Sequence, residues 1–172
     1  MLICVNAFAQ TNWVVDSSSV TFEILNAGIA VNGSFDGLNA NIKFDPEDLS
    51  RSKVIASIEA GTVNTGIRIR DKHLRKPDYF FTDSFPTIQL TCEDFYSGDD
   101  GGFTGNWTLA LKGHDKPVSI PFTFKQNSSI ARIEGSFVIN RREFDIGGRS
   151  PILADEVTVA IVVWAHHAKQ AD

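Results

Sequence analysis

Apolar and polar residues alternate in one segment after another along this chain. In residues 20–24, for example, Val20, Phe22 and Ile24 share one face while the residues between them are polar. The same period of two recurs at residues 38–44, 54–60, 88–92, 107–111, 118–124, 133–139 and 157–163. This period is the signature of a β-strand with one buried face. The chain therefore predicts eight strands, and a short stretch at 31–35 is expected to join the second of them across a Gly-rich bend.

The predicted strands are separated by sequences typical of turns. These lie at residues 45–46, 97–102, 112–117 and 126–129. Two-faced strands joined mostly by short turns form a meandering antiparallel sheet, and eight of them can close into a barrel without exposed edges. A two-sheet sandwich would show the same alternation, so periodicity alone leaves closure open.

One connection, residues 67–82, lacks this period of two and is rich in charge. Ile67, Arg70 and Leu74 recur in it at spacings of three and four, and Pro77 would end any helix that they form. Long ordered connections are commonly functional. We expect this one to cap an end of the sheet structure.

Composition and charge narrow the class of protein. The 172 residues suit one domain, and the net charge of −5 comes from interspersed acids and bases without a basic patch. Nucleic acid is therefore not an expected partner. No stretch is long and apolar enough to span a bilayer. The bias toward Phe, with 13 Phe against three Trp and two Tyr, favours a wide apolar interior.

The first nine residues differ from the rest of the chain. They are uncharged and mostly apolar, and they end in an Ala-Phe-Ala sequence typical of a cleavage site. We interpret residues 1–9 as the remnant of a secretory signal peptide and residues 10–172 as a single domain; a short apolar N-terminus is the alternative. Export implies a periplasmic or secreted protein. Without residues 1–9, which contain Cys4, the domain has one cysteine, Cys92. Cys92 is in phase with Leu90 and is expected to be a buried apolar residue without a disulfide.

Several motifs agree in order and spacing with one family. They are Val15-Asp16 to Phe22, Thr65-Gly66, Arg70-Asp71, His73-Leu74-Arg75, Asp78-Tyr79-Phe80, Phe85-Pro86-Thr87-Ile88, Lys112-Gly113 with Lys116-Pro117-Val118, Ile139-Asn140-Arg141 with Phe144, and Asp155-Glu156-Val157. Together they resemble the YceI-like family, periplasmic lipocalin-like barrels associated with polyisoprenoid binding, over roughly residues 13 to 165. Ala110, His114-Asp115 and Asp145 depart from the family pattern and affect the details of two hairpins.

The resemblance implies an all-β fold: an eight-stranded antiparallel up-and-down lipocalin-like barrel with one helix-bearing capping loop. It also implies a hydrophobic pore that holds an isoprenoid-type lipid, either a polyprenyl chain or an isoprenoid quinone. The class of ligand follows from the resemblance, but its head group and chain length do not. No cofactor other than such a lipid is expected, and a homodimer is left open.

The residues predicted to face inward mix bulky and small side chains. The small ones either leave room for a ligand or relieve crowding where strands bend, and the sequence does not separate these interpretations. An eight-stranded barrel has room for one small ligand. The expected apolar lining is Phe22, Ile24, Ala40, Ile42, Phe44, Ala56, Ile58, Leu90, Trp107, Leu109, Phe122, Phe124, Phe137, Val159 and Ile161.

The charged loop supplies the polar residues of the predicted mouth. Arg70, His73 and Arg75 are candidates to pair with a phosphate or to hydrogen-bond a quinone head group. In the alternative interpretation, Arg70–Asp71 and Arg75–Asp78 are ion pairs that pin the cap, and His73 is a hydrogen-bonding strut.

Motifs for catalysis or metal binding are not found. The chain has no Gly-x-Ser-x-Gly elbow and no Gly-rich phosphate loop. His114 falls in a predicted turn and His166-His167 in a predicted tail, so no three ligands have metal spacing. We therefore expect a binding protein rather than an enzyme. The alternatives are a stress-protection or interaction protein with a filled barrel, and an enzyme that acts on an isoprenoid lipid.

Overall fold

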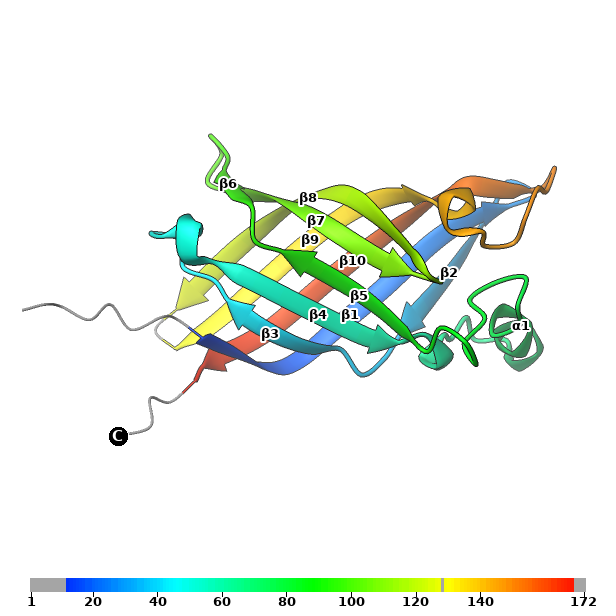
Figure 1. Ribbon diagram of the computed structural model, residues 1–172, viewed down its shortest axis with the longest axis horizontal. Helices are drawn as coiled ribbons and strands as arrows, with labels where there is room; N and C mark the ends of the chain where they lie inside the picture. The colour runs from blue at the N-terminus through cyan, green and yellow to red at the C-terminus, as the bar shows by residue number, and fades with distance from the viewer. Residues whose placement is uncertain (1–11, 128, 169–172) are drawn as a thin grey trace, which may run out of the picture.

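Ten strands form a single antiparallel sheet within residues 12–127 and 129–168, the part of the chain that this computed structural model describes (Figure 1). The strands are β1 (Asn12–Asn26), β2 (Ile29–Phe35), β3 (Asn39–Lys43), β4 (Lys53–Glu59), β5 (Thr87–Cys92), β6 (Phe95–Ser97), β7 (Phe103–Leu111), β8 (His114–Asn127), β9 (Ile130–Asn140) and β10 (Leu153–His167). The connections contain the α-helix α1 (Arg68–Leu74) and the 3-10 helices η1 (Leu49–Arg51), η2 (Ala60–Thr62) and η3 (Arg141–Phe144). The expected signal-peptide remnant, residues 1–9, lies outside the described residues.

Eight of these strands close into a barrel. Around the ring the order is β1, β10, β9, β8, β7, β5, β4 and β3, and β3 pairs with β1 again. β2 and β3 act as one strand, because Val20 pairs with Phe35 and Trp13 pairs with Ile42 in a single register. Between them the chain bends at residues 36–38. The predicted eight-stranded barrel is confirmed, and the sandwich is excluded because the sheet closes on itself.

Two hairpins use the tightest turns that antiparallel strands allow. Ala27-Gly28 joins β1 to β2, and Lys112-Gly113 joins β7 to β8; all four residues have positive φ, between 50° and 77°. Two consecutive residues of positive φ are typical of the type I′ turn, whose twist matches that of the strands. The predicted turn over residues 112–117 is thus too long, because β8 already begins at His114.

Two prolines lie inside β8, and the first of them explains why the predicted turn over residues 112–117 is too long. Pro117 and Pro121 face β7, where they pair with Thr108 and Thr104. The ladder between β8 and β9 begins only at Phe122, after both prolines. Proline has no N–H group to donate, but at these two positions β9 offers no ladder partner, so no hydrogen bond to β9 is lost. A proline pair in a long strand is therefore tolerated here, although locally it is typical of a turn.

The helix in the charged connection is confirmed. α1 covers Arg68–Leu74 and ends before Pro77, as its spacing predicts. Asp145, one of the departures from the family pattern, follows η3 with a φ of 53°. Aspartate is one of the few residues that enter this left-handed region readily, so it can replace a glycine there.

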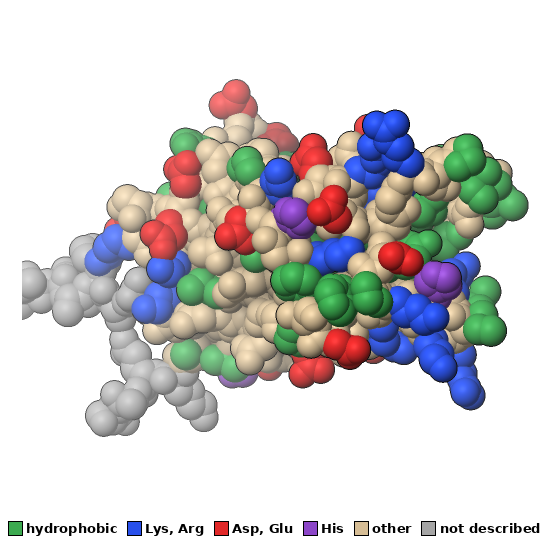
Figure 2. Space-filling model, turned by 45° about the vertical axis from the view of Figure 1, so that its right-hand side comes forward, with side chains coloured by type: hydrophobic (Ala, Val, Ile, Leu, Met, Phe, Trp, Pro, Cys, Tyr) green, Lys and Arg blue, Asp and Glu red, His purple; other side chains and the backbone are tan. Residues whose placement is uncertain are grey.

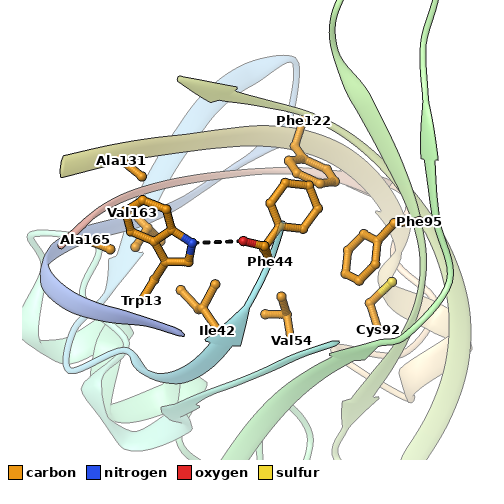
Figure 3. Close-up of a cluster of buried hydrophobic side chains, with 10 residues drawn as sticks. All are labelled: Trp13, Ile42, Phe44, Val54, Cys92, Phe95, Phe122, Ala131, Val163 and Ala165. Carbon is orange, nitrogen blue, oxygen red and sulfur yellow. Dashed lines mark hydrogen bonds between the residues drawn. The ribbon is translucent and has the colours of Figure 1, made fainter. Parts of the chain in front are cut away.

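The two ends of the barrel differ. At one end lie α1, the β1–β2 hairpin and the connection from β9 to β10, at the right of Figure 1; Figure 2 turns this end toward the viewer and shows His, Lys and Arg side chains close to protruding apolar ones. The opposite end holds a cluster of buried apolar side chains (Figure 3). We call the first the mouth and the second the closed end.

Aromatic side chains fill the closed end. Phe44 is 2% exposed, and its ring centroid lies 5.0–5.4 Å from those of Phe95, Phe103, Phe122 and Phe124. The indole Nε1 of Trp13 donates a hydrogen bond of 3.0 Å to the carbonyl oxygen of Phe44 (Figure 3). Edge-to-face packing and this buried bond make the closed end a solid core.

Candidate functional site

A cavity of about 730 Å³ occupies the barrel between the aromatic core of the closed end and the mouth. Its volume falls within the roughly 300–1,000 Å³ typical of small-molecule sites. Its wall includes β10 residues from Leu153 near the mouth to Val163 at the closed end. At roughly 3.3 Å per residue and a strand tilt near 40°, this corresponds to a length of about 25 Å along the barrel axis. The cavity is therefore long and narrow.

Apolar side chains make most of this wall. Of the fifteen apolar residues expected to line the pore, the structure places all except Phe124 in it. Phe124 belongs to the closed end, where its ring packs 5.4 Å from that of Trp13. Strand alternation identifies which residues point inward, but it does not show at which depth the barrel is filled.

The small inward-facing residues have two different roles. Ala40 and Ala56 pair directly across β3 and β4, and both line the cavity, so they leave it room. A Cβ atom at Gly135 would lie 3.1 Å from the carbonyl oxygen of Pro121, so this glycine relieves crowding. Each interpretation of the small residues is thus correct at a different place in the wall.

Residues outside the period-two pattern complete the lining near the mouth. Ile69, Tyr79 and Phe80 come from α1 and the turn after it, and Ile146 and Ile152 come from the connection between β9 and β10. Sequence reasoning missed them because irregular segments carry no alternation that would show which side chains face the pore.

Three polar side chains join at the mouth through Thr65. Arg70 donates from Nε to Thr65 Oγ1 (2.7 Å) and from Nη2 to the Thr65 carbonyl oxygen (2.8 Å). Thr65 in turn donates from Oγ1 (2.5 Å) and from its backbone N–H (2.8 Å) to Asp71 Oδ1. The direct Arg70–Asp71 ion pair of the alternative interpretation is therefore wrong, because Thr65 bridges the two side chains.

Asp71 and Arg70 have different surroundings despite this shared partner. The hydroxyl of Thr65 holds the pKa of the buried Asp71 carboxyl below its ordinary value of 3.8, and the backbone N–H of Thr65 with the charges of Arg75 and Arg70 adds to this effect. Arg70 lines the cavity, and none of the described residues bonds its Nη1. Asp71 is thus a structural anchor, whereas Arg70 keeps a free donor at the mouth.

His73 and Arg75 have different roles in the cap. His73 lines the cavity, and its ring meets Tyr79 edge-on with centroids 5.2 Å apart. Arg75 is not part of the lining; it donates from Nε to the carbonyl oxygen of Gly61 (2.7 Å) and from Nη2 to that of Val63 (3.1 Å). Arg75 therefore ties the cap to the barrel rim through these carbonyl groups rather than through Asp78.

Arg141 is a site residue that sequence reasoning did not single out. It is 2% exposed, yet it lies in the cavity wall. Its guanidinium donates to Asp155 Oδ1 (2.9 Å) and to four backbone carbonyl oxygens, those of Ile146, Gly148, Leu153 and Ala154. Five acceptors satisfy a buried cation and fix the shape of the rim segment. Only the Ile-Asn-Arg motif pointed to this position, and it suggested no role.

The other three histidines, His114, His166 and His167, contact an aspartate or an aromatic ring. His114 opens β8, with Nε2 3.1 Å from Asp145 Oδ2. His166 and His167 lie in β10 and not in a tail: His166 Nδ1 is 2.7 Å from Asp16 Oδ1, and His167 packs on Trp13. Within the described ranges, no three His, Cys, Asp or Glu side chains are grouped closely enough to hold a metal ion.

Cys92 is buried at the closed end, as predicted. Its Sγ donates to the carbonyl oxygen of Asp94 (3.3 Å), and burial raises the pKa of the thiol to about 11. A thiol with this pKa is protonated at neutral pH and is a poor nucleophile.

The helices of the described residues are not membrane spans. The helix α1 is too short to cross a membrane, and no other helix in residues 12–127 and 129–168 is long and apolar enough to do so.

Comparison with known sequences gives one consistent match. Residues 13–165 match the family described as YceI-like domain. A UPF0312 protein of Staphylococcus aureus is 37% identical over 145 residues, which are 80% of this chain and 83% of the relative. UPF0312 proteins of Shewanella denitrificans and Pectobacterium atrosepticum are 28% and 33% identical, but the matches cover only 65% and 53% of their lengths.

Solved structures agree in fold. BcnA of Burkholderia cenocepacia superposes with a TM-score of 0.84 at 22% identity, over 88% of this chain and 99% of that one. A polyisoprenoid binding domain from Saccharophagus degradans superposes with a TM-score of 0.73 at 15% identity, over 92% and 99%. At these identities the likeness shows a shared barrel.

Proposed function

This chain belongs to the YceI-like domain family, and on that basis we propose that it binds an apolar, isoprenoid-type lipid inside its barrel and sequesters or carries it. The observation that carries this proposal is the cavity: long, narrow, almost wholly apolar, filled with aromatic rings at one end and bordered by cations at the other. A flexible apolar chain with one polar end has the matching shape. The name of the Saccharophagus degradans neighbour, a polyisoprenoid binding domain, supports the same class of ligand.

Burial of the chain supplies the affinity in this proposal. Each CH₂ group removed from water contributes about 0.8 kcal/mol, so several isoprene units offset the entropy that the ligand loses on binding. Ala40 and Ala56 lie side by side on adjacent strands and both line the lumen, so this part of the wall leaves room for a chain. A preformed cavity needs little rearrangement to accept the chain.

We assign the polar end of the ligand to Arg70 and His73 at the mouth. Two donors of Arg70 are held by Thr65, which fixes the guanidinium in place while Nη1 stays free. This arrangement suits a phosphate or carbonyl oxygen. Cys92 offers no nucleophile to a ligand held there, because its thiol is buried at the closed end with a pKa of about 11.

Native mass spectrometry tests the proposal. The protein is purified without detergent, measured directly, and measured again after incubation with all-trans-farnesol or with hexadecanol, a straight-chain control. We expect a one-to-one farnesol complex that survives desalting. Capture of hexadecanol to the same extent would overturn the isoprenoid preference, and capture of neither alcohol would overturn lipid binding.

Farnesyl phosphate tests the assignment of the mouth. We expect it to bind more tightly than farnesol, and Arg70→Gln to remove most of this difference, about tenfold, because a hydrogen bond to a charged group contributes about 1.5–3 kcal/mol. Lys125→Gln, a change to an exposed residue of β8, is the matched control and should leave the ratio unchanged. An unchanged ratio in Arg70→Gln would place the head group elsewhere.

We further propose that the protein works in the periplasm or outside the cell. The support is the apolar segment 1–9 with its Ala-Phe-Ala ending. Mass spectrometry of the N-terminal peptide, from protein fractionated out of its own host, tests this. A mature chain that begins at Gln10 in the periplasmic or secreted fraction is expected, and a chain that keeps Met1 in the cytoplasmic fraction would overturn the proposal.

A further inference from the structure

The mouth carries the most exposed large apolar side chains of the described residues. These are Ile69 at 81%, Ile29 at 72% and Ile152 at 58% exposure. They come from three segments far apart in the sequence: α1, the start of β2 and the connection before β10. All three segments lie at the same end of the barrel (Figure 1).

This apolar rim is continuous with the cavity. Ile69 and Ile152 are strongly exposed and also line the pore. A lipid chain that leaves the lumen would therefore pass directly along side chains that face the outside. Exposed large apolar side chains at the edge of a ligand cavity are typical of an interaction site.

Cations gather beside the rim. Arg68, Lys72 and Lys76 are exposed and four residues apart, on α1 and the turn after it, and none of them forms an ion pair with a described residue. Figure 2 shows Lys and Arg side chains grouped at this end beside a histidine and protruding apolar side chains. The acid within the helix, Asp71, is buried and bound to Thr65. The helix therefore presents positive charge outward, although the whole chain has a net charge of −5.

We propose that the mouth docks on an anionic lipid surface, with the isoleucines inserted among the lipid chains and the three cations against the head groups. Apolar side chains beside Lys and Arg are the combination that holds a protein in the plane of such a surface. A second copy of this chain fits less well, because a mouth-to-mouth contact would place like charges against one another. The proposal rests on the lipid-carrying function and names the source of the lipid: the ligand passes between bilayer and lumen without crossing water.

Two double variants with the same chemistry test the docking. The rim variant is Ile29→Ser/Lys72→Gln; the distal variant is Ile130→Ser/Lys125→Gln, in which Ile130 is 50% exposed at the closed end of β9. Neither Ile29 nor Lys72 lines the cavity. Each variant loses one exposed isoleucine and one exposed lysine, so only the position differs.

Flotation with vesicles of equal parts phosphatidylcholine and phosphatidylglycerol is the measurement. We expect the wild type and the distal variant to float, and the rim variant to bind roughly tenfold more weakly or worse, because one cation near an anionic surface contributes about a factor of five and the isoleucine adds to it. Equal binding by the two variants, or no flotation of the wild type, would overturn the proposal. Self-association of the wild type that the rim variant abolishes would replace it with a dimer.

Farnesol capture in vesicle-free buffer is measured on the same samples. Capture without flotation means that the docking is wrong and the lipid-binding function stands. Flotation without capture means that the function is wrong and the docking stands. We expect the rim variant to capture farnesol as the wild type does, and a loss of capture would overturn the separation of docking from binding on which this proposal depends.

Discussion

The closed end and the mouth are built from the same strands, yet one is solid and the other hollow. At the closed end, the ring of Phe44 touches four other phenylalanine rings and its carbonyl group is bonded by Trp13. In the hollow part, Ala40 of β3 and Ala56 of β4 lie side by side in the wall and leave space. The backbone is alike in both regions. The size of the inward side chains therefore decides where the barrel is filled.

The two regions are also stabilised differently. The closed end depends on apolar packing, which tolerates little loss of volume. The mouth has smaller buried apolar clusters, around Val63 and around Phe144, and hydrogen bonds from Arg141, Arg75 and Thr65 hold its irregular segments in place. We infer that stability resides mainly at the closed end and binding mainly in the hollow part.

Truncation of one apolar side chain in each region should show this difference in stability most clearly. Phe44→Ala is expected to lower the free energy of unfolding by about 3–5 kcal/mol, the range for a buried aromatic ring that leaves a void. Ile24→Ala, in the cavity wall, should cost less than about 2 kcal/mol, because its side chain already borders empty space. Urea unfolding followed by circular dichroism measures both. Equal losses would mean that the cavity wall is as tightly packed as the closed end.

Enlargement of two alanines should separate binding from stability. Ala56→Phe places a ring in the lumen; we expect unchanged stability and about tenfold weaker farnesol binding, since a loss of about two buried CH₂ groups has that effect. Ala60→Phe is the matched control: Ala60 is 1% exposed and outside the lining, so overpacking should cost about 1–3 kcal/mol there. Thermal unfolding and fluorescence competition with farnesol distinguish the two. If Ala56→Phe binds farnesol normally, the ligand does not lie in this part of the lumen.

The strands were largely predictable because alternation is a local property of the sequence, whereas their closure into a barrel followed only from the family resemblance. Residues 133–139 lie in β9, and residues 54–59 of the predicted strand 54–60 lie in β4, whereas Ala60 begins η2. Strand ends were less predictable: Pro117 in β8 is typical of a turn, and only the absence of β9 beside it makes it acceptable. The short strand β6 was missed because residues 95–97 are too few to show a period.

The chemistry of the mouth was harder to predict than the wall. Arg75 and Arg70 are five residues apart in the same charged loop, but one faces a carbonyl pair on the rim and the other faces the lumen. The role of Arg141 depends on five acceptors spread over the segment that follows it. Such roles depend on tertiary contacts, which single-residue patterns do not encode.

Acid should loosen the mouth before it affects the closed end. The pKa of Asp71 is lowered in the folded state, so its contribution to stability is present above the ordinary value of 3.8 and is lost as the pH falls through the folded value. We expect hydrogen exchange of the α1 amides, corrected for its intrinsic pH dependence, to accelerate below about pH 4, while amides of β10 near Val163 stay protected. Asp71→Asn should be loosened already at neutral pH and lack this transition. Equal acceleration in both regions would show one cooperative unit.

Trp107 marks the border between the two regions, and its indole group offers the finest test. Its ring packs on Phe95 of the closed end (5.8 Å) and also lines the cavity, but its buried Nε1 has no hydrogen-bond partner among the described residues. Trp107→Phe removes an unsatisfied donor, so the lost ring area is partly offset and we expect a change within about 1 kcal/mol. Trp13→Phe instead leaves the buried carbonyl group of Phe44 without its donor and should cost about 1–3 kcal/mol more. Urea unfolding of the two variants side by side measures the difference. Equal costs would mean that the Nε1 of Trp107 is bonded in solution, and the border would then be a polar site rather than an apolar one.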